Sequence, residues 1–258
     1  MTSRKVETQL DFWGHLDELR SVLLRVIAAT MVFAVAAFCM KEWLFAVILA
    51  PHTSDFVTYR LLGVDTFAIR LVNTGLTEQF MMHMKAACYA GLLLASPYVL
   101  FELFRFVSPG LYRNERQAAV WVTGCAYLMF IVGTLLNYFL VFPLTVRFLG
   151  TYQVSAEVGN LLTLQSYMDT LLTLTLVMGV VFELPVVTAL LAHLGLLTDR
   201  LMERYRRHAV VVILIVAAVI TPTTDVFTLL VVAFPVWLLY ELSILLCKIV
   251  QKHGIKKD

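Results

Sequence analysis

The sequence predicts an all-α membrane protein that forms a single domain over residues 1–258. Hydrophobic residues make up 60% of the chain and charged residues only 15%, with a mean hydropathy of +0.83. In soluble domains, by contrast, roughly a quarter of the residues are charged. The apolar residues also gather into six segments that polar and charged stretches separate. We therefore expect helices that cross a membrane several times.

An amphipathic helix is predicted at residues 8–20, ahead of the first apolar segment. Apolar residues recur on one face at helical spacing, and polar residues recur on a second face at Asp11, His15 and Glu18. A helix of this kind lies along the membrane interface and leads into the first span. The polar face is interpreted as solvent-exposed, because no second cluster of ligands accompanies it to complete a metal site.

Six membrane spans are predicted, at residues 22–40, 79–101, 118–142, 166–192, 209–221 and 226–247. A span needs about 20 residues, which the fifth segment does not reach before Pro222. We therefore expect the fifth and sixth helices to be short or kinked and to form a hairpin. Most Lys and Arg residues precede the first span, follow the second and fourth spans, or close the chain. By the positive-inside rule, both termini are predicted to be cytoplasmic.

Glu183 is the first candidate functional residue, because it lies near the centre of the apolar run Val177–Leu191. A charge at mid-bilayer costs roughly 3 kcal/mol on insertion scales, so such residues usually face an interior or a hydrated cavity. Pro185 is predicted to bend the helix there, since proline frees a backbone carbonyl one turn earlier. The alternative is a packing role, in which Glu183 hydrogen-bonds a neighbouring helix.

A second group of acids lies on the predicted inner surface. Glu102 and Glu115 belong to the stretch that follows the second span, where Pro109 fixes a turn, and Glu18 belongs to the amphipathic helix. Carboxylates bind guanidinium groups bidentately, so this surface could receive an arginine-bearing peptide. The alternative is internal pairing of Glu115 with Arg113 or Arg116.

No catalytic motif is present in the sequence. Ser108 has no GxSxG context, the histidines do not cluster, and no Walker or GxGxxG pattern occurs. Asp169 and Asp225 are interpreted as carboxylates at helix N-termini. We expect no enzyme activity, no cofactor, no metal and no nucleic-acid partner.

Five strings carry a resemblance to a known family. They are HLDELR at 15–20, SPGLYRNER at 108–116, YFLVFPL at 138–144, VFELP at 181–185 and TPTTDVF at 221–227. In this order and spacing, over about residues 8–247, they resemble the TatC family, the core subunit of the twin-arginine translocase. The resemblance implies a concave six-helix protein in the bacterial inner membrane. It also implies a receptor for twin-arginine signal peptides that passes folded proteins across the membrane using the proton-motive force.

The family motifs assign roles to residues of this chain. Their acids imply signal-peptide binding by Glu18 and Glu115, and the implied neighbours are Arg20, Phe106, Pro109 and Arg113, with Glu102 as a weaker addition. Glu183 is implied as a contact for small single-span subunits of the TatA and TatB type, together with Thr221 and Asp225. Pro51 is implied to shape the outer cap and Pro185 the bend. Self-association in a receptor complex is also implied.

Two alternative functions remain from the residues alone. The first is a proton- or ion-coupled transporter of small solutes that uses Glu183 as its relay. The second is an intramembrane enzyme, which would need another polar group at the depth of Glu183, and the neighbouring spans offer Thr123, Thr173 and Thr175. Solute uptake by liposomes containing this protein alone would favour the first.

Overall fold

The computed structural model describes residues 3–61, 63, 70–107, 116–152, 161–193, 195–221 and 225–254. Most of these residues are helical. The elements are α1 (Ser3–Cys39), α2 (Lys41–Leu49), η1 (Ala50–His52), α3 (Val57–Leu61), β1 (Leu71–Val72), α4 (Glu78–Val107), α5 (Arg116–Leu136), η3 (Asn137–Val141), α6 (Phe142–Thr151), β2 (Leu162–Thr163), α7 (Leu164–Val181), α8 (Leu184–His193), α9 (Asp199–Ile220) and α10 (Val226–Gly254).

Within the described residues, five helical stretches are long and apolar enough to cross a membrane, which confirms a helical membrane protein. They are Trp13–Cys39, Glu78–Phe106, Val122–Thr151, Leu164–His193 and Val226–Lys252. The fifth predicted segment lies in α9, whose first half is rich in charges, and α9 is not among the five. The sixth segment is not short, because α10 has 29 residues with Pro235 inside it. The predicted helix at 8–20 leads into the first span, as expected, since α1 continues without a break from Ser3 to Cys39.

The chain divides into two compact units. Unit 1 comprises Met1–Met40 and Ala87–Tyr127, and unit 2 comprises Lys41–Ala86 and Leu128–Asp258. Two of these boundaries fall inside α4 and α5 and so do not mark a linker between separately folded parts. The single membrane domain therefore stays a prediction.

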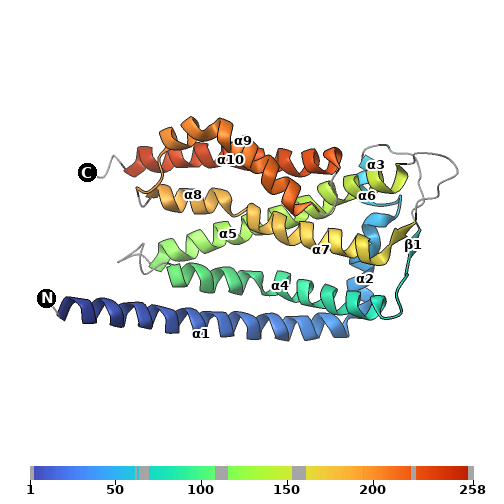
Figure 1. The fold of residues 1–258 in the computed structure, drawn as a ribbon, viewed down its shortest axis with the longest axis horizontal. Coiled ribbons are helices and arrows are strands. Elements are labelled where there is room, and N and C mark those ends of the chain that lie inside the picture. Colours follow the sequence, from blue (N-terminus) through green and yellow to red (C-terminus); the bar gives the residue numbers. More distant parts are fainter. Residues whose placement is uncertain are drawn as a thin grey trace. The chain divides into compact units, whose positions relative to one another are not determined.

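In unit 1, α1 lies along α4 (Figure 1). Gly91 of α4 permits this close approach, because a Cβ there would come within 2.6 Å of the backbone nitrogen of Ala34 on α1. Small residues are the usual means by which membrane helices bring their backbones together.

Unit 2 packs the remaining helices around a core of apolar side chains. Its members come from η3, α7, α9 and α10 and include Val141, Leu174, Met178, Ala217 and Val232. Gly133 of α5 lies directly against α7, since a Cβ at this position would come within 2.6 Å of the carbonyl oxygen of Met178. A π-helical turn, η3, joins α5 to α6 without a break. Such turns frequently mark functional sites.

A cap formed by α2, η1 and α3 closes one end of unit 2, where α2 runs across the axis of α7 (Figure 1). Pro51 is buried in this cap, and its role in shaping the cap stays a prediction. The hydroxyl of Tyr59 lies 3.0 Å from the carbonyl oxygen of Pro51 and 2.9 Å from that of Pro143. Tyr167 donates to the carbonyl of Ile48 at 2.8 Å. Burial raises the pKa of Tyr59 above its ordinary value, so the hydroxyl remains a donor.

A short parallel sheet also belongs to unit 2, and the sequence analysis did not predict it. Leu71 of β1 pairs with Leu162 of β2, and Val72 pairs with Thr163. This pairing brings the chain that enters α4 next to the chain that enters α7, so the two helix N-termini start side by side.

Candidate functional site

The first candidate region is the contact between α1 and α4 in unit 1, which we call the α1–α4 surface. It comprises His15, Glu18, Arg25, Glu102 and Phe106. The rings of His15 and Phe106 stack with centroids 4.2 Å apart and planes inclined by 12°. Further along the same contact, Nη2 of Arg25 lies 2.8 Å from Oε2 of Glu102. Two side-chain contacts, one aromatic stack and one ion pair, therefore join the helices.

Glu102 is buried in this contact, with only 4% of its side chain exposed. Arg25 binds one carboxylate oxygen, and Nη1 of Arg105 lies 3.7 Å from the other. A buried carboxylate needs such partners, because an uncompensated buried charge is costly. Glu102 is thus already neutralised, which leaves it little capacity for an incoming cation.

Glu18 lies on α1 between His15 and Arg25 in the sequence. Its side chain is exposed, as is that of Arg20. No described residue forms an ion pair with Glu18. Its carboxylate can accept a guanidinium from solution. The other predicted residues of this region, Pro109, Arg113 and Glu115, lie in the segment 108–115, outside the described residues.

The second candidate region is the break between α7 and α8 in unit 2. The helix ends at Val181 and a new one begins at Leu184, which confirms the predicted bend. Pro185 is the physical cause, since its nitrogen has no hydrogen to donate to the carbonyl one turn earlier. Around the break the packing is tight, because Gly179 lies against Phe130 and Gly133 lies against Phe182.

Glu183 lies in this break. Both of its carboxylate oxygens are buried, and neither has a hydrogen-bond partner among the described residues. Buried polar groups are nearly always hydrogen-bonded, so an orphaned carboxyl calls for an explanation. The alternative of a packing acid bonded to a neighbouring helix has no bond to support it in the described part of the chain.

Thr221 and Asp225 lie at helix ends. The hydroxyl of Thr221 donates to the carbonyl of Ala217 at 2.9 Å, within the end of α9. Oδ1 of Asp225 accepts from the backbone nitrogen of Thr228 at 2.7 Å, which confirms Asp225 as a carboxylate at the N-terminus of α10. Both side chains thus have local roles, and a partner contact by either stays a prediction.

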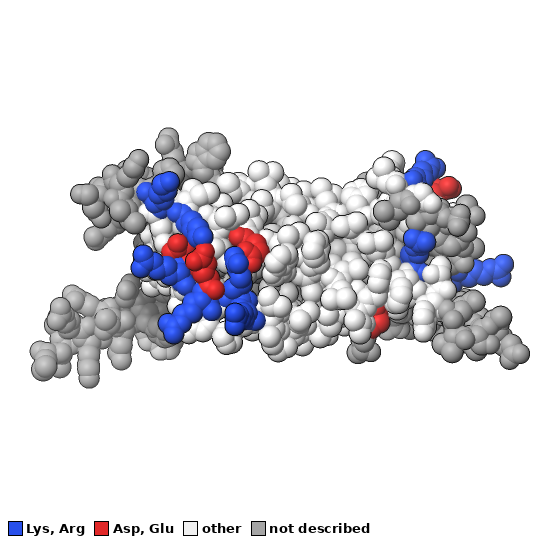
Figure 2. Space-filling view, turned by 90° about the horizontal axis from the view of Figure 1, so that it is seen from above, with Lys and Arg blue, Asp and Glu red and all other residues white. Residues whose placement is uncertain are grey.

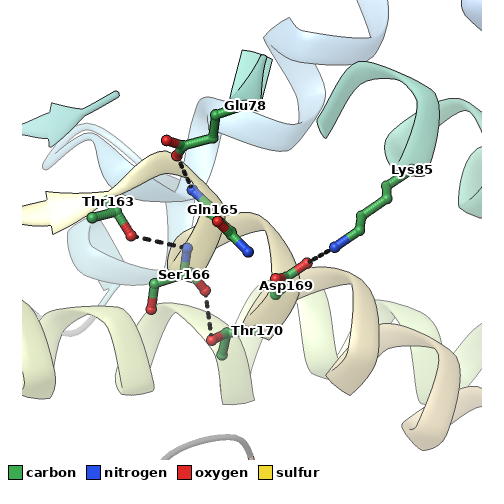
Figure 3. A network of polar contacts seen from close by, with 7 residues as sticks. All are labelled: Glu78, Lys85, Thr163, Gln165, Ser166, Asp169 and Thr170. Atoms are coloured by element: carbon green, nitrogen blue, oxygen red, sulfur yellow. Dashed lines mark hydrogen bonds and ion pairs between the residues drawn. The ribbon is translucent and has the colours of Figure 1, made fainter. Parts of the chain in front are cut away.

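A third polar region, which the sequence analysis missed, lies where α4 and α7 begin in unit 2 (Figure 3). Oε2 of Glu78 accepts from the backbone nitrogens of Thr74 at 2.9 Å and Gly75 at 2.8 Å. Oε1 accepts from the backbone nitrogen of Gln165 at 2.9 Å. One carboxylate therefore ties the loop before α4 to the first turn of α7.

Lys85 and Asp169 form a second link between the same helices (Figure 3). Nζ of Lys85 lies 2.9 Å from Oδ1 of Asp169, and both side chains are about half buried. Asp169 is thus an ion-pair partner inside α7, and its interpretation as a helix N-terminal carboxylate is wrong. The sequence contained a signal for this pair, because Lys85 and Asp169 have opposite charges and each lies a few residues after the start of an apolar segment.

The charged surface of unit 2 lies at one end of α9 and α10. Figure 2 shows Lys and Arg gathered there with Asp and Glu, next to a broad uncharged area. Arg206 of α9 pairs with Glu241 of α10 at 2.6 Å, and Lys248 of α10 pairs with Glu203 of α9 at 2.5 Å. A charged border beside an apolar zone is the expected surface of a helix pair that enters a membrane.

Comparisons with known proteins agree with these features. A family model for the Sec-independent protein translocase protein TatC matches residues 14–235. The chain is 35% identical to TatC of Koribacter versatilis over 251 residues, covering 96% of this chain and 89% of the relative. It is 30% identical to TatCy of Bacillus subtilis, covering 100% and 96% of the two chains. A crystal structure of the twin-arginine translocase receptor TatC superposes with a TM-score of 0.78 at 30% identity, covering 92% of this chain and 99% of that one.

Proposed function

The chain belongs to the TatC family of Sec-independent protein translocase subunits, and we propose that it is the receptor that binds twin-arginine signal peptides of folded cargo. The binding region is the α1–α4 surface. Glu18 contributes one carboxylate. Glu115 contributes a second, and this assignment rests on its place in the family motif. Arg20, Phe106, Pro109 and Arg113 are the neighbours in this proposal.

The observation that carries the proposal is the contrast between two acids of the α1–α4 surface. Glu102 is buried and held by Arg25 and Arg105, whereas Glu18 is exposed and forms no ion pair with any described residue. A guanidinium can form two parallel hydrogen bonds to an open carboxylate. In this proposal Glu18 receives an arginine of the signal peptide, and Glu102 keeps α1 and α4 in position.

Glu183 is the proposed contact for the small single-span subunits of the TatA and TatB type. Its buried carboxyl has no hydrogen-bond partner in the described part of the chain, and a polar side chain of another membrane helix would supply one. Thr221 lies at the C-terminal end of α9 and Asp225 at the N-terminal end of α10. In this proposal both contribute to the contact with the single-span subunits. Further elements of the proposal are self-association in the receptor complex and translocation driven by the proton-motive force.

The proposed topology has six spans in the bacterial inner membrane with both termini in the cytoplasm. The distribution of Lys and Arg along the sequence supports it. In this arrangement α9 is the fifth span. Its apolar part is shorter than about 20 residues, so the bilayer would thin locally around it.

The test is photo-crosslinking of a signal peptide to the protein in membrane vesicles. Glu18→Gln should lower the yield about tenfold, because a charged hydrogen-bonded contact contributes roughly 1.5–3 kcal/mol. A peptide whose two arginines are replaced by lysines should crosslink weakly to the unaltered protein, since lysine lacks the bidentate fork.

Asp17→Asn is the matched control, because Asp17 is an exposed acid at the neighbouring position of α1. It should leave the yield unchanged. Full crosslinking to a variant that carries both Glu18→Gln and Glu115→Gln would refute the proposed receptor site.

A further inference from the structure

A cavity of about 540 Å³ lies in unit 2 between α2, the start of α4 and the start of α7. Its volume falls within the roughly 300–1,000 Å³ of typical ligand pockets. It is lined by Lys41, Phe45, Leu49, Leu76, Gln79, Phe80, His83 and Leu164. None of these residues belongs to the α1–α4 surface or to the break at Glu183, so the proposed function leaves the cavity without a role.

The lining combines an apolar floor with one cation. Five of the eight residues are aliphatic or aromatic, and Lys41, Gln79 and His83 supply the polar groups. His83 is buried and meets the ring of Phe45 edge-on, with centroids 5.6 Å apart. The cavity therefore suits an amphiphile more than a wholly polar solute.

The charge of Lys41 is not compensated within the described part of the chain. The side chain is exposed, and no described acid lies within ion-pair distance of it. Glu78 precedes Gln79, but its carboxylate is occupied by Thr74, Gly75 and Gln165. A negatively charged group entering the cavity would thus find a cation with no competing acid among the described residues.

The residues that line the cavity lie near the ends of two apolar stretches. Lys41 comes two residues after the stretch Trp13–Cys39, and Gln79 lies at the start of the stretch Glu78–Phe106. Phe80 is 59% exposed and Leu76 fully exposed at its rim, and Trp43 of α2 is 73% exposed. Exposed aromatic side chains with a lysine at the ends of spans are typical of the membrane–water interface.

We propose that this cavity binds an anionic phospholipid. The phosphate contacts the ammonium group of Lys41, the glycerol and ester groups lie near Gln79 and His83, and the upper part of an acyl chain covers Phe45, Leu49 and Phe80. The net charge of the headgroup complements Lys41, the lysine of the lining, and the acyl chain complements the apolar residues of the lining. A zwitterionic lipid would retain the apolar contacts and lose the favourable net charge.

The test uses the full chain in nanodiscs of phosphatidylcholine that contain a small fraction of phosphatidylglycerol with a photoactivatable acyl chain. Mass spectrometry after illumination should locate the label on α2 and the first turns of α4. Lys41→Gln should lower the labelling about fivefold, the loss expected for one basic side chain near an anionic lipid. Lys41→Arg should restore it. Lys252→Gln, at an exposed position of α10, is the control and should change nothing.

Leu76→Ser is a second variant that keeps the charge, and because Leu76 is fully exposed the fold does not depend on its side chain. It should lower labelling by the acyl-chain probe. Equal labelling by a phosphatidylcholine probe, or undiminished labelling of Lys41→Gln, would overturn the proposal. Loss of label in excess inorganic phosphate would identify a site for free anions instead. Replacement of the lipid label by a crosslink to a co-reconstituted single-span subunit would identify a helix as the occupant.

Discussion

Glu78 and Glu183 are two acids of unit 2 with buried carboxylates, and they differ in the hydrogen bonds that those carboxylates accept. Glu78 accepts from three backbone nitrogens and from the hydroxyl of Thr74. Glu183 accepts from no described residue. Glu78 therefore contributes to folding, since its removal would leave several donors unpaired. Glu183 forms no comparable hydrogen bonds within the described part of the chain, which agrees with its proposed role as a contact for another membrane helix.

The largest expected effect on stability comes from Glu78→Ala. The backbone nitrogens of Thr74, Gly75 and Gln165 would lose their charged acceptor, so three part-buried hydrogen bonds would be lost together. We expect the unfolding midpoint of the detergent-purified protein to fall by roughly 5–10 °C. Glu42→Ala, at an exposed acid of α2, is the control. A midpoint equal to that of the unaltered protein would show that the Glu78 network does not hold α4 to α7.

A smaller effect is expected from Lys85→Ala, which removes the second link between α4 and α7. Both partners of this pair are about 40% exposed, so the loss in unfolding free energy should be roughly 1 kcal/mol or less. A double-mutant cycle with Asp169→Ala measures the coupling between the two side chains. Additive losses in that cycle would mean that the ion pair contributes nothing to stability.

The smallest effect on stability is expected from Glu183→Leu. Replacing a buried, unpartnered acid by an apolar residue should leave the free energy of unfolding unchanged or raise it by roughly 1 kcal/mol. Export of a twin-arginine cargo and association with the single-span subunits should nevertheless fall, with signal-peptide crosslinking retained. A strongly destabilised variant would instead mean that Glu183 holds the fold, and unchanged export would count against its proposed partner contact.

The α1–α4 surface shows which structural features a local sequence pattern can predict and which it cannot. The helical pattern of residues 8–20 and the acids Glu18 and Glu102 were read from the sequence, and both acids lie on adjoining helices of unit 1. Their difference was only partly predictable. Arg105, three residues after Glu102, is a partner that the local sequence offers, at 3.7 Å, but the shorter contact comes from Arg25, 77 residues away.

The sequence by itself determined the helical membrane class, the order of the apolar helices, the break at Pro185 and the family. These features depend on residue composition and on backbone hydrogen bonds between near neighbours, so a local pattern reveals them. Only the tertiary structure decided which acids have partners. Glu78 meets Gln165 across 87 residues and Lys85 meets Asp169 across 84. Such contacts depend on how helices far apart in the chain pack. The same packing creates the cavity at Lys41 and leaves the carboxyl of Glu183 without a hydrogen-bond partner among the residues that the structure describes.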